Sequence, residues 1–183
     1  MTFSEILSLF LNPLHAAQGL RDFLEMGGGV LVIILIATFA LWTLILERYW
    51  YFTSTHHDVK ADVLQQWAER KDHNSWAARR VRDRLISQIR MATTRNLSII
   101  KVLVALAPLF GLLGTVTGMV EVFDVMAITG SGNARAMAAG ISKATLPTMA
   151  GMVAALSGIY FSARLERRAH REVQFTIDGM ELR

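Results

Sequence analysis

Two long stretches of the sequence contain no charged residue, and they constrain the fold more than any other feature. Residues 102–120 form a run of 19 uncharged residues and residues 144–163 a run of 20, each close to the roughly 20 residues that a helix needs to cross a bilayer core. A third apolar run, 30–46, follows three consecutive glycines. With 52% hydrophobic residues and a mean hydropathy of +0.35, the chain is too apolar for an ordinary soluble domain. We therefore predict an all-α membrane protein with three transmembrane helices, at 27–46, 102–120 and 144–163.

The segments outside the apolar runs differ in their polar patterns. Residues 3–14 place apolar side chains on one helical face, so we expect 1–26 to hold an amphipathic helix, either in the membrane interface or packed on protein. Residues 47–101 form a basic helical loop without Pro or Gly, which predicts helices that extend both flanking spans. Turn-forming residues predict a break in this loop near 71–75. The other polar segments are a turn and a tail, at 121–143 and 164–183.

Positive charges gather on one side of the predicted spans. The loop between the first two runs contains ten Lys or Arg before Lys101 and the tail five, against one before the first run and two in the turn. Because Lys and Arg are retained in the cytoplasm, we predict a periplasmic N-terminus and turn, with the loop and tail in the cytoplasm. A membrane-topology pattern also explains the high pI of about 9.8, so we do not expect nucleic-acid binding.

Small residues recur in the second and third runs. Gly114 and Gly118 form a GxxxG motif, and Gly151 and Ala155 form a second pair at the same spacing. In lipid no hydrophobic force drives helices together, so small residues that allow close backbone approach become the contact surface. We assign these four residues and Gly111 to helix packing.

Threonines give the same two runs a polar component. Thr115 and Thr148 both fall toward the outer halves of their antiparallel spans, so they could face one another and, with Thr145, line a polar seam. The alternative is a bond from each hydroxyl back to a carbonyl of its own helix. A hydroxyl does not titrate near neutral pH, and none of the three apolar runs contains a carboxylate or His. We expect any titrating group of a proton path to come from another polypeptide.

The remaining constellations favour no catalytic chemistry. The chain has no Cys, and His56, His57 and His73 with Asp58 match no usual metal-ligand spacing. No phosphate-binding loop, dinucleotide-binding pattern or nucleophile elbow occurs. We predict a protein that is not an enzyme and has no cofactor, metal site or catalytic residue. Four arginines after the third run are candidate anchors for anionic lipid head groups, or serve only as positive-inside anchors: Arg164, Arg167, Arg168 and Arg171.

Two segments of the hairpin resemble a known signature. The sequences APLFGLLGTVTGM at 107–119 and GISKATLPTMAGMVAA at 140–155 resemble the MotA/TolQ/ExbB proton-channel family, most closely its ExbB members. A two-part motif at this spacing is far more specific than a single GxxxG. Thr115 and Thr148 match the pore-facing threonines of the family.

The resemblance implies a fold, a location and partners. It implies a multi-pass protein of the bacterial inner membrane that forms a homo-oligomer, typically a pentamer, around a central lumen. Helices of an ExbD-like single-span partner would occupy that lumen and supply a membrane Asp. The complex would use proton-motive force to act on TonB, which energises outer-membrane uptake of siderophore iron, haem or cobalamin.

Two residues depart from the family pattern. Lys143 stands where many members have Glu, and Ser157 stands where they often have Pro. Two alternative functions remain open at the level of sequence. One is a TolQ-like subunit of the Tol-Pal envelope system, and the other is a membrane scaffold whose small residues serve only assembly.

Overall fold

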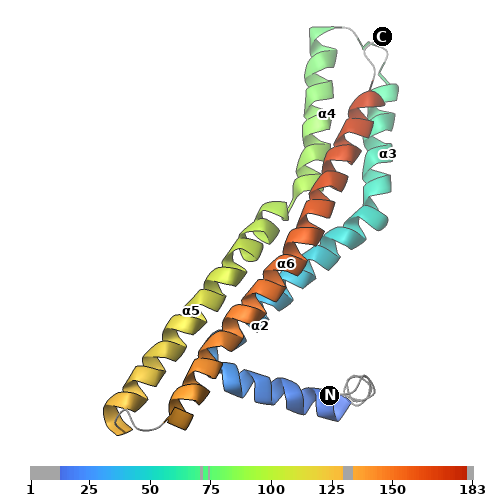
Figure 1. Ribbon diagram of the computed structural model, residues 1–183. Coiled ribbons are helices and arrows are strands. Elements are labelled where there is room, and N and C mark those ends of the chain that lie inside the picture. Colours follow the sequence, from blue (N-terminus) through green and yellow to red (C-terminus); the bar gives the residue numbers. More distant parts are fainter. Residues whose placement is uncertain (1–12, 71, 74, 130–133, 181–183) are drawn as a thin grey trace. The chain divides into compact units, whose positions relative to one another are not determined.

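The computed structural model describes residues 13–70, 72–73, 75–129 and 134–180, and every regular element within them is a helix. Most of the predicted amphipathic helix at 3–14 lies outside the described residues. Figure 1 shows the five helices in chain order: α2 (Pro13–Thr53), α3 (Thr55–Ala68), α4 (Trp76–Thr94), α5 (Leu97–Thr129) and α6 (Ala134–Asp178).

The all-α prediction is confirmed for the described residues. Three helical stretches among them are long and apolar enough to cross a membrane: Gly27–Thr53, Trp76–Ile128 and Met137–Asp178. Each contains one of the apolar runs. The helices also continue past those runs, since α2 extends to Thr53 and α6 to Asp178.

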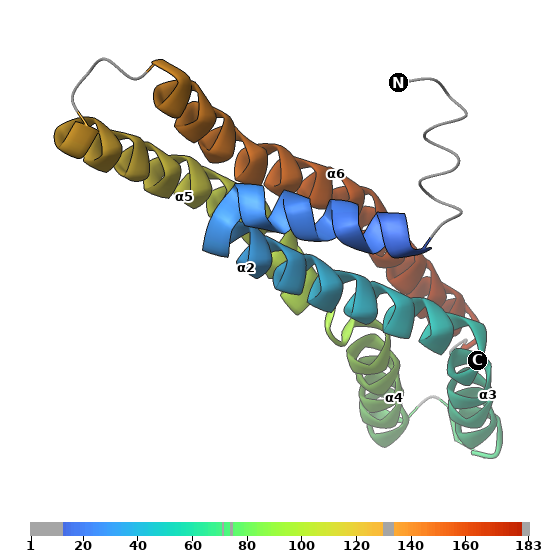
Figure 2. The ribbon, with the colours of Figure 1, turned by 90° about the horizontal axis from the view of Figure 1, so that it is seen from below.

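Contacts divide the chain into two compact units. The first, which we call the hairpin unit, takes Met1–Thr38 and Ala105–Ala155, and the second, the bundle unit, takes Phe39–Val104 and Leu156–Arg183. In the hairpin unit, α5 and α6 lie side by side and antiparallel, as Figures 1 and 2 both show.

A glycine bends α2 within the hairpin unit. Gly28 has φ 68° and ψ −166°, so two helical segments meet there at a kink. This conformation is strained for any residue with a Cβ and is open to glycine. The three consecutive glycines that precede the first apolar run therefore supply a bend at the start of that run.

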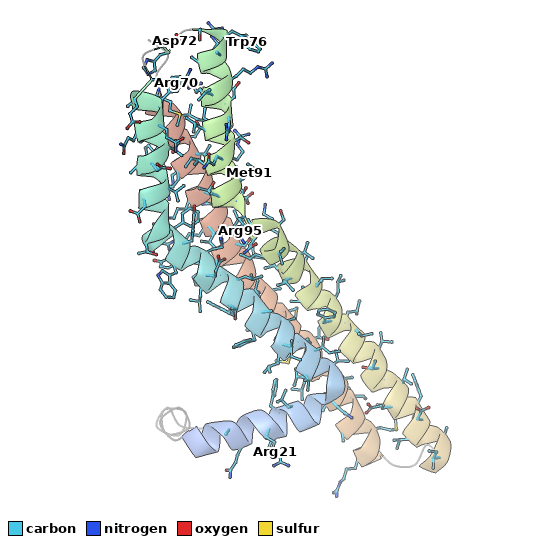
Figure 3. All side chains as sticks on the ribbon, turned by 180° about the vertical axis from the view of Figure 1, so that it is seen from behind. Arg21, Arg70, Asp72, Trp76, Met91 and Arg95 are labelled. Atoms are coloured by element: carbon cyan, nitrogen blue, oxygen red, sulfur yellow. The ribbon has the colours of Figure 1, made fainter. Side chains whose placement is uncertain are left out.

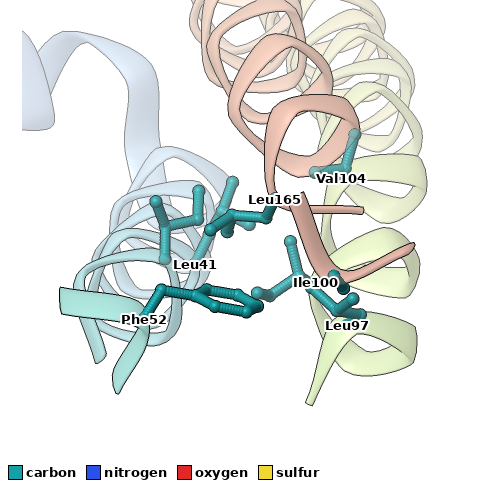
Figure 4. Close-up of a cluster of buried hydrophobic side chains, with 8 residues drawn as sticks. Leu41, Phe52, Leu97, Ile100, Val104 and Leu165 are labelled. Carbon is teal, nitrogen blue, oxygen red and sulfur yellow. The ribbon is translucent and has the colours of Figure 1, made fainter. Parts of the chain in front are cut away.

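Large apolar side chains form the interior of the bundle unit. One cluster joins Leu41 and Phe52 of α2 to Leu97 and Ile100 of α5 and Leu165 of α6 (Figure 4). A second cluster joins α3, α4, the last turns of α6 and Met180, which follows α6: Val63, Trp67, Ala78, Leu85, Ile89, Val173 and Met180. Burial of such side chains from water is the ordinary drive for packing.

The predicted break in the basic loop is confirmed. Helix α3 ends at Ala68 and α4 begins at Trp76, and Figure 3 labels Asp72 and Trp76 at this connection. The hydroxyl of Ser75 accepts a hydrogen bond from the N–H of Ala78 at 3.1 Å, as an N-cap does. A carboxylate oxygen of Asp72 in turn accepts a bond from the N–H of Ser75 at 3.1 Å.

Two further breaks have no Pro or Gly signal in the sequence. One is at Ser54, between α2 and α3, and the other is at Arg95 and Asn96, between α4 and α5. Asn96 has φ 61°, the left-handed conformation that Asn tolerates better than most residues. Its side-chain amide donates to a carboxylate oxygen of Glu47 at 3.3 Å, which ties the α4–α5 junction to α2.

A buried arginine completes this junction. Arg48 is only 2% exposed, and its guanidinium donates to both carboxylate oxygens of Glu47 at 2.8 and 2.7 Å. It also donates to the carbonyl of Ala92 at 3.1 Å and lies 4.8 Å from the centre of the Tyr51 ring. Burial of an arginine is costly unless its N–H groups have partners, and these contacts supply them.

Candidate functional site

Glycines of α5 lie where α6 comes closest. A Cβ added to Gly111 would stand 2.9 Å from Cα of Thr148, and one added to Gly118 would stand 2.7 Å from Cα of Ala144. A Cβ on Gly114 would overlap the ring of Pro147. Because the Gly111 and Gly118 contacts are with backbone, a larger residue at either position would have to push the two helices apart.

Glycines of α6 make the reciprocal contacts. A Cβ on Gly151 would stand 2.5 Å from the carbonyl oxygen of Ala107, and one on Gly140 would overlap Val122. Ala155 is buried in a small cluster with Ala107 and Ala154. The packing role of Gly140 was not among the sequence predictions, although its distance of eleven residues from Gly151 is three helical turns and places both on one face.

The hydroxyl of Thr148 bridges the two helices. Its Oγ1 donates to the carbonyl oxygen of Gly111 at 3.0 Å. A threonine in a helix commonly bonds to its own preceding turn, so a partner on another helix distinguishes Thr148. The absence of a side chain on Gly111 is what allows this approach.

The other threonines bond within their own helices. Thr115 donates to the carbonyl of Leu112 at 2.7 Å and Thr145 donates to that of Ser142 at 2.9 Å. Thr115 is half-buried, whereas Thr145 is exposed. Among the hydrogen bonds of the described residues, none joins Thr115 to Thr148. Instead the two hydroxyls donate to the carbonyls of adjacent residues in α5, Leu112 and Gly111.

This arrangement fixes what the hydroxyls can offer a ligand. A hydroxyl has one proton to donate and two lone pairs to accept with. In Thr115, Thr145 and Thr148 the proton is already donated to a carbonyl. Each oxygen therefore keeps acceptor capacity, and each can donate to a ligand only by rotating away from its carbonyl.

The sequence profile of the MotA/TolQ/ExbB proton channel family matches residues 54–176, about two thirds of the chain. This range includes the whole glycine-packed and threonine-bearing contact between α5 and α6. The chain belongs to this family.

Individual relatives point to the ExbB type within the family. An ExbB-like biopolymer transport protein of Synechocystis is 27% identical over 98% of this chain and 85% of its own length. The biopolymer transport protein ExbB of Helicobacter pylori is 35% identical over 39% of this chain and 49% of its own length. An ExbB-like biopolymer transport protein of Helicobacter pylori is 31% identical over 45% and 44% of the two chains. The two Helicobacter alignments thus span about half of those relatives or less.

Lys143, which departs from the family pattern, has a partner on α5. Its ammonium forms an ion pair with the carboxylate of Glu121 at 2.5 Å, and both side chains are partly exposed. A Cβ added to Gly28 would stand 3.5 Å from Cε of Lys143. A basic residue at this family position is therefore charge-compensated within the hairpin unit.

The four arginines of the lipid-anchor prediction lie in two different environments. Arg168 is half-buried, donates to the carbonyl of Phe52 at 3.2 Å and lies 5.3 Å from the centre of that ring. Arg164, Arg167 and Arg171 are exposed, and within the described part of the chain none of them forms an ion pair or side-chain hydrogen bond. Arg168 thus has a contact at the C-terminal end of α2, where a cation is favourable.

The histidine-containing loop is only partly described. Within the described residues, no group of three or more His, Cys, Asp or Glu could hold a metal ion. The side chains of His56 and His57 lie outside those residues, so the absence of a metal site there stays a prediction. His73 is described, and its ring contacts Trp67 at a centroid distance of 4.9 Å.

Proposed function

We propose that the chain is an ExbB-like inner-membrane subunit of a motor driven by proton-motive force. With an ExbD-like single-span partner, it energises TonB for outer-membrane uptake of siderophore iron, haem or cobalamin. The observation that carries the proposal is a pair of apolar helices with oriented hydroxyls and no carboxylate or His within their apolar runs. Thr148 bonds across to α5, while the three apolar runs contain no carboxylate or His.

The missing acid defines a division of labour. A proton crossing a membrane through protein normally uses a titrating side chain at depth, so the partner contributes that group as a membrane Asp. This chain contributes the helices that surround the partner. In the proposed assembly the N-terminus is periplasmic, and a pentamer of hairpins presents Thr115, Thr148 and Thr145 to a lumen that contains the partner's helices.

The threonines then respond to the charge of the Asp. When the Asp is protonated, it donates to a hydroxyl oxygen while that hydroxyl keeps its bond to the α5 carbonyl. When the Asp is ionised, the hydroxyl has to rotate and donate to the carboxylate, which gives up the 3.0 Å bond between Thr148 and Gly111. This arrangement favours the protonated form of the partner's Asp near Thr148. The Asp should therefore take up a proton before it moves past Thr148.

The energy scale of such a motor is set by the membrane potential. One proton moving through 100 mV releases about 2.3 kcal/mol. That energy is comparable to the cost of one or two hydrogen bonds left unmade in a buried site. Reorientation of a single hydroxyl is therefore a step that one proton can drive.

The test of the division of labour is proton flux into liposomes. The chain alone should conduct few protons, and the chain with its ExbD-like partner should conduct more. Thr148→Val removes the hydroxyl and keeps the shape, so it should reduce the flux of the complex about ten-fold or more, which corresponds to the loss of one hydrogen bond to a charged or reacting group. Robust conduction by the chain alone would contradict the proposal.

A matched control lies on the same hairpin. Thr117→Val makes the same chemical change in α5, where Thr117 is exposed and bonds to its own helix at 3.1 Å. It should leave flux and assembly unchanged. If Thr148→Val and Thr115→Val both leave growth on siderophore iron intact, the threonines serve only assembly.

The process that the complex drives is tested separately from its proton conduction. A single-span protein with a membrane Asp should co-purify with the chain, and a gene for TonB should lie nearby. Neighbouring genes of the Tol-Pal system would assign the same proton chemistry to envelope constriction instead. The proton-flux experiment does not distinguish nutrient uptake from envelope constriction.

A further inference from the structure

An open groove runs along one side of α6 in the bundle unit and changes from apolar to basic along its length. Its volume is about 970 Å³, and every residue that lines it belongs to α6. In its first half, Leu156 and Tyr160 are 68% and 61% exposed. Its second half is lined by three exposed arginines, which we call the groove arginines: Arg164, Arg167 and Arg171.

The groove continues the helical face that carries the threonines. Three turns of an α-helix take about eleven residues. The groove contains residues at this step from both threonines: Leu156 and Arg167 from Thr145, and Ile159 and His170 from Thr148. In the proposed function the threonine face is turned toward the lumen of the oligomer. The groove then lines the same lumen nearer to the cytoplasm.

The positive charge of the groove is not balanced within the chain. The two nearby acids of α6 are already paired, Glu166 with Lys101 at 2.6 Å and Glu172 with Lys60 at 3.4 Å. The groove arginines have no such partner among the described residues, in contrast to Arg168, which donates to a carbonyl. In the oligomer the groove arginines of all copies face one lumen, where like charges repel one another unless an anion lies between them.

The single-span partner has to pass this level of the lumen. The third apolar run ends at residue 163 and the groove arginines begin at 164. A helix that crosses the membrane inside the lumen therefore contacts the apolar half of the groove and leaves the membrane beside the arginines. Cytoplasmic ends of membrane helices ordinarily carry Lys or Arg. A basic segment at this level would be repelled by the groove arginines.

We propose that the groove arginines bind an acidic segment of the partner, directly on the cytoplasmic side of its span. Guanidinium groups bind carboxylates through two parallel N–H···O bonds, so the geometry and the charge of Asp and Glu both match. The inference rests on the proposed function for the lumen and adds the chemistry of the partner's cytoplasmic segment. That segment departs from the positive charge usual at this side of a membrane.

The sequence of the single-span protein that co-purifies with the chain gives the first test. Arg164 and Arg171 are about 10 Å apart along α6, so the acidic residues should lie within about ten residues of the partner's span. We expect more Asp and Glu than Lys and Arg there. An excess of Lys and Arg would overturn this inference, whereas co-purification and proton flux would still support the proposed function.

Variants of the full-length chain test the contact by affinity for the labelled partner in detergent at low salt. R164Q/R167Q/R171Q should lower this affinity about ten-fold, at about two-fold for each exposed charge pair. R164K/R167K/R171K retains the charge and should keep most of the affinity. R79Q/R84Q/R90Q removes the same charge from exposed positions of α4 and should leave the affinity unchanged. An equal loss in the α4 triple, or no loss in the groove triple, would overturn the inference.

An exchange of charges tests the pairing directly. R164E/R167E/R171E should weaken the complex more than the change to Gln, because the carboxylates would then repel the acidic segment. A partner that carries Lys in place of the Asp and Glu of this segment should restore the affinity. Thermal unfolding of each variant checks that the chain still folds. A folded charge-reversed chain that the Lys-bearing partner fails to rescue would contradict the pairing.

Photo-cross-linking separates the partner from other occupants of the groove. A photo-reactive residue in place of His170, which lines the groove, should cross-link to the cytoplasmic segment of the partner in membranes. The same residue in place of Trp76, which is 74% exposed on α4, should not. Cross-linking from position 170 only to lipid, or only to a second copy of the chain, would overturn the inference. If no single-span protein co-purifies with the unchanged chain, the proposed function fails together with it.

Discussion

The hairpin unit and the bundle unit are both helical, yet they are held together in opposite ways. In the hairpin unit, α5 and α6 approach so closely at Gly111, Gly118 and Gly151 that an added Cβ would meet backbone atoms of the other helix. In the bundle unit the interior consists of large apolar side chains such as Phe52, together with a fully buried arginine, Arg48.

Much of the difference follows from the solvent around each contact, since the glycine contacts lie within the apolar runs, whereas the cluster of α3, α4 and the end of α6 lies outside them. In lipid an apolar side chain gains nothing by leaving the solvent, so helices associate where small residues allow close contact. In water each buried apolar side chain contributes, and larger ones contribute more. The same chain therefore uses glycine as its main packing residue in one unit and leucine, isoleucine and phenylalanine in the other.

The largest effect is expected in the bundle unit, at Arg48. Arg48→Ala removes a side chain that is 2% exposed and leaves the Ala92 carbonyl without its 3.1 Å partner. The loss of packing and of buried hydrogen bonds should lower the free energy of unfolding by about 3 kcal/mol. Unfolding in detergent, followed by circular dichroism, measures this change. Arg95→Ala, an exposed arginine at the same junction that Figure 3 labels, should cost less than about 0.5 kcal/mol.

A smaller loss of stability is expected when a methyl group is added to a glycine of the hairpin unit. Gly118→Ala inserts a methyl group 2.7 Å from the backbone of Ala144, so the helices must separate. Overpacking of this kind should cost about 2 kcal/mol, measured by the same unfolding assay. Gly29→Ala is the control, because a Cβ there meets no atom within 4 Å. Equal tolerance of both changes would contradict the backbone-contact account of the hairpin.

The smallest contribution to stability is expected from an ion pair, and it should be about equal in the two units. Each has a partly exposed ion pair, Lys143 with Glu121 at 2.5 Å and Lys101 with Glu166 at 2.6 Å. A double-mutant cycle to Gln at either pair should give about 0.5 kcal/mol, falling as salt is added. A much larger value for the hairpin pair would show that Lys143 lies in lipid and not in water.

Much of the fold was predictable because it depends on local signals. Uncharged runs located the three apolar helices, and the turn chemistry of Asp72 and Ser75 located the α3–α4 break. The α4–α5 break was missed because Asn96 is a weak local signal. Its left-handed conformation accompanies a hydrogen bond to Glu47, which is 49 residues away in sequence.

The candidate site was predictable in composition and less so in geometry. Sequence named Thr148 but left open whether its hydroxyl bonds within its own helix, because the register of α6 against α5 decides which carbonyl it meets. That register also determines that Gly111, and not Thr115, lies opposite Thr148. The four arginines of α6 were grouped by proximity in sequence, although Arg167 and Arg168 are about 100° apart around the helix and so have different surroundings.

The buried Arg48 also has a consequence for the order of events during synthesis. The carbonyl that it needs, that of Ala92, is 44 residues later in the chain. At translation rates of about 5–20 residues per second, that carbonyl is made roughly 2–9 s after Arg48. During this interval Glu47, the preceding residue, is the hydrogen-bond partner of Arg48 that has already been made. Arg48 can therefore complete its hydrogen bonds only after residue 92, near the end of α4, has been made.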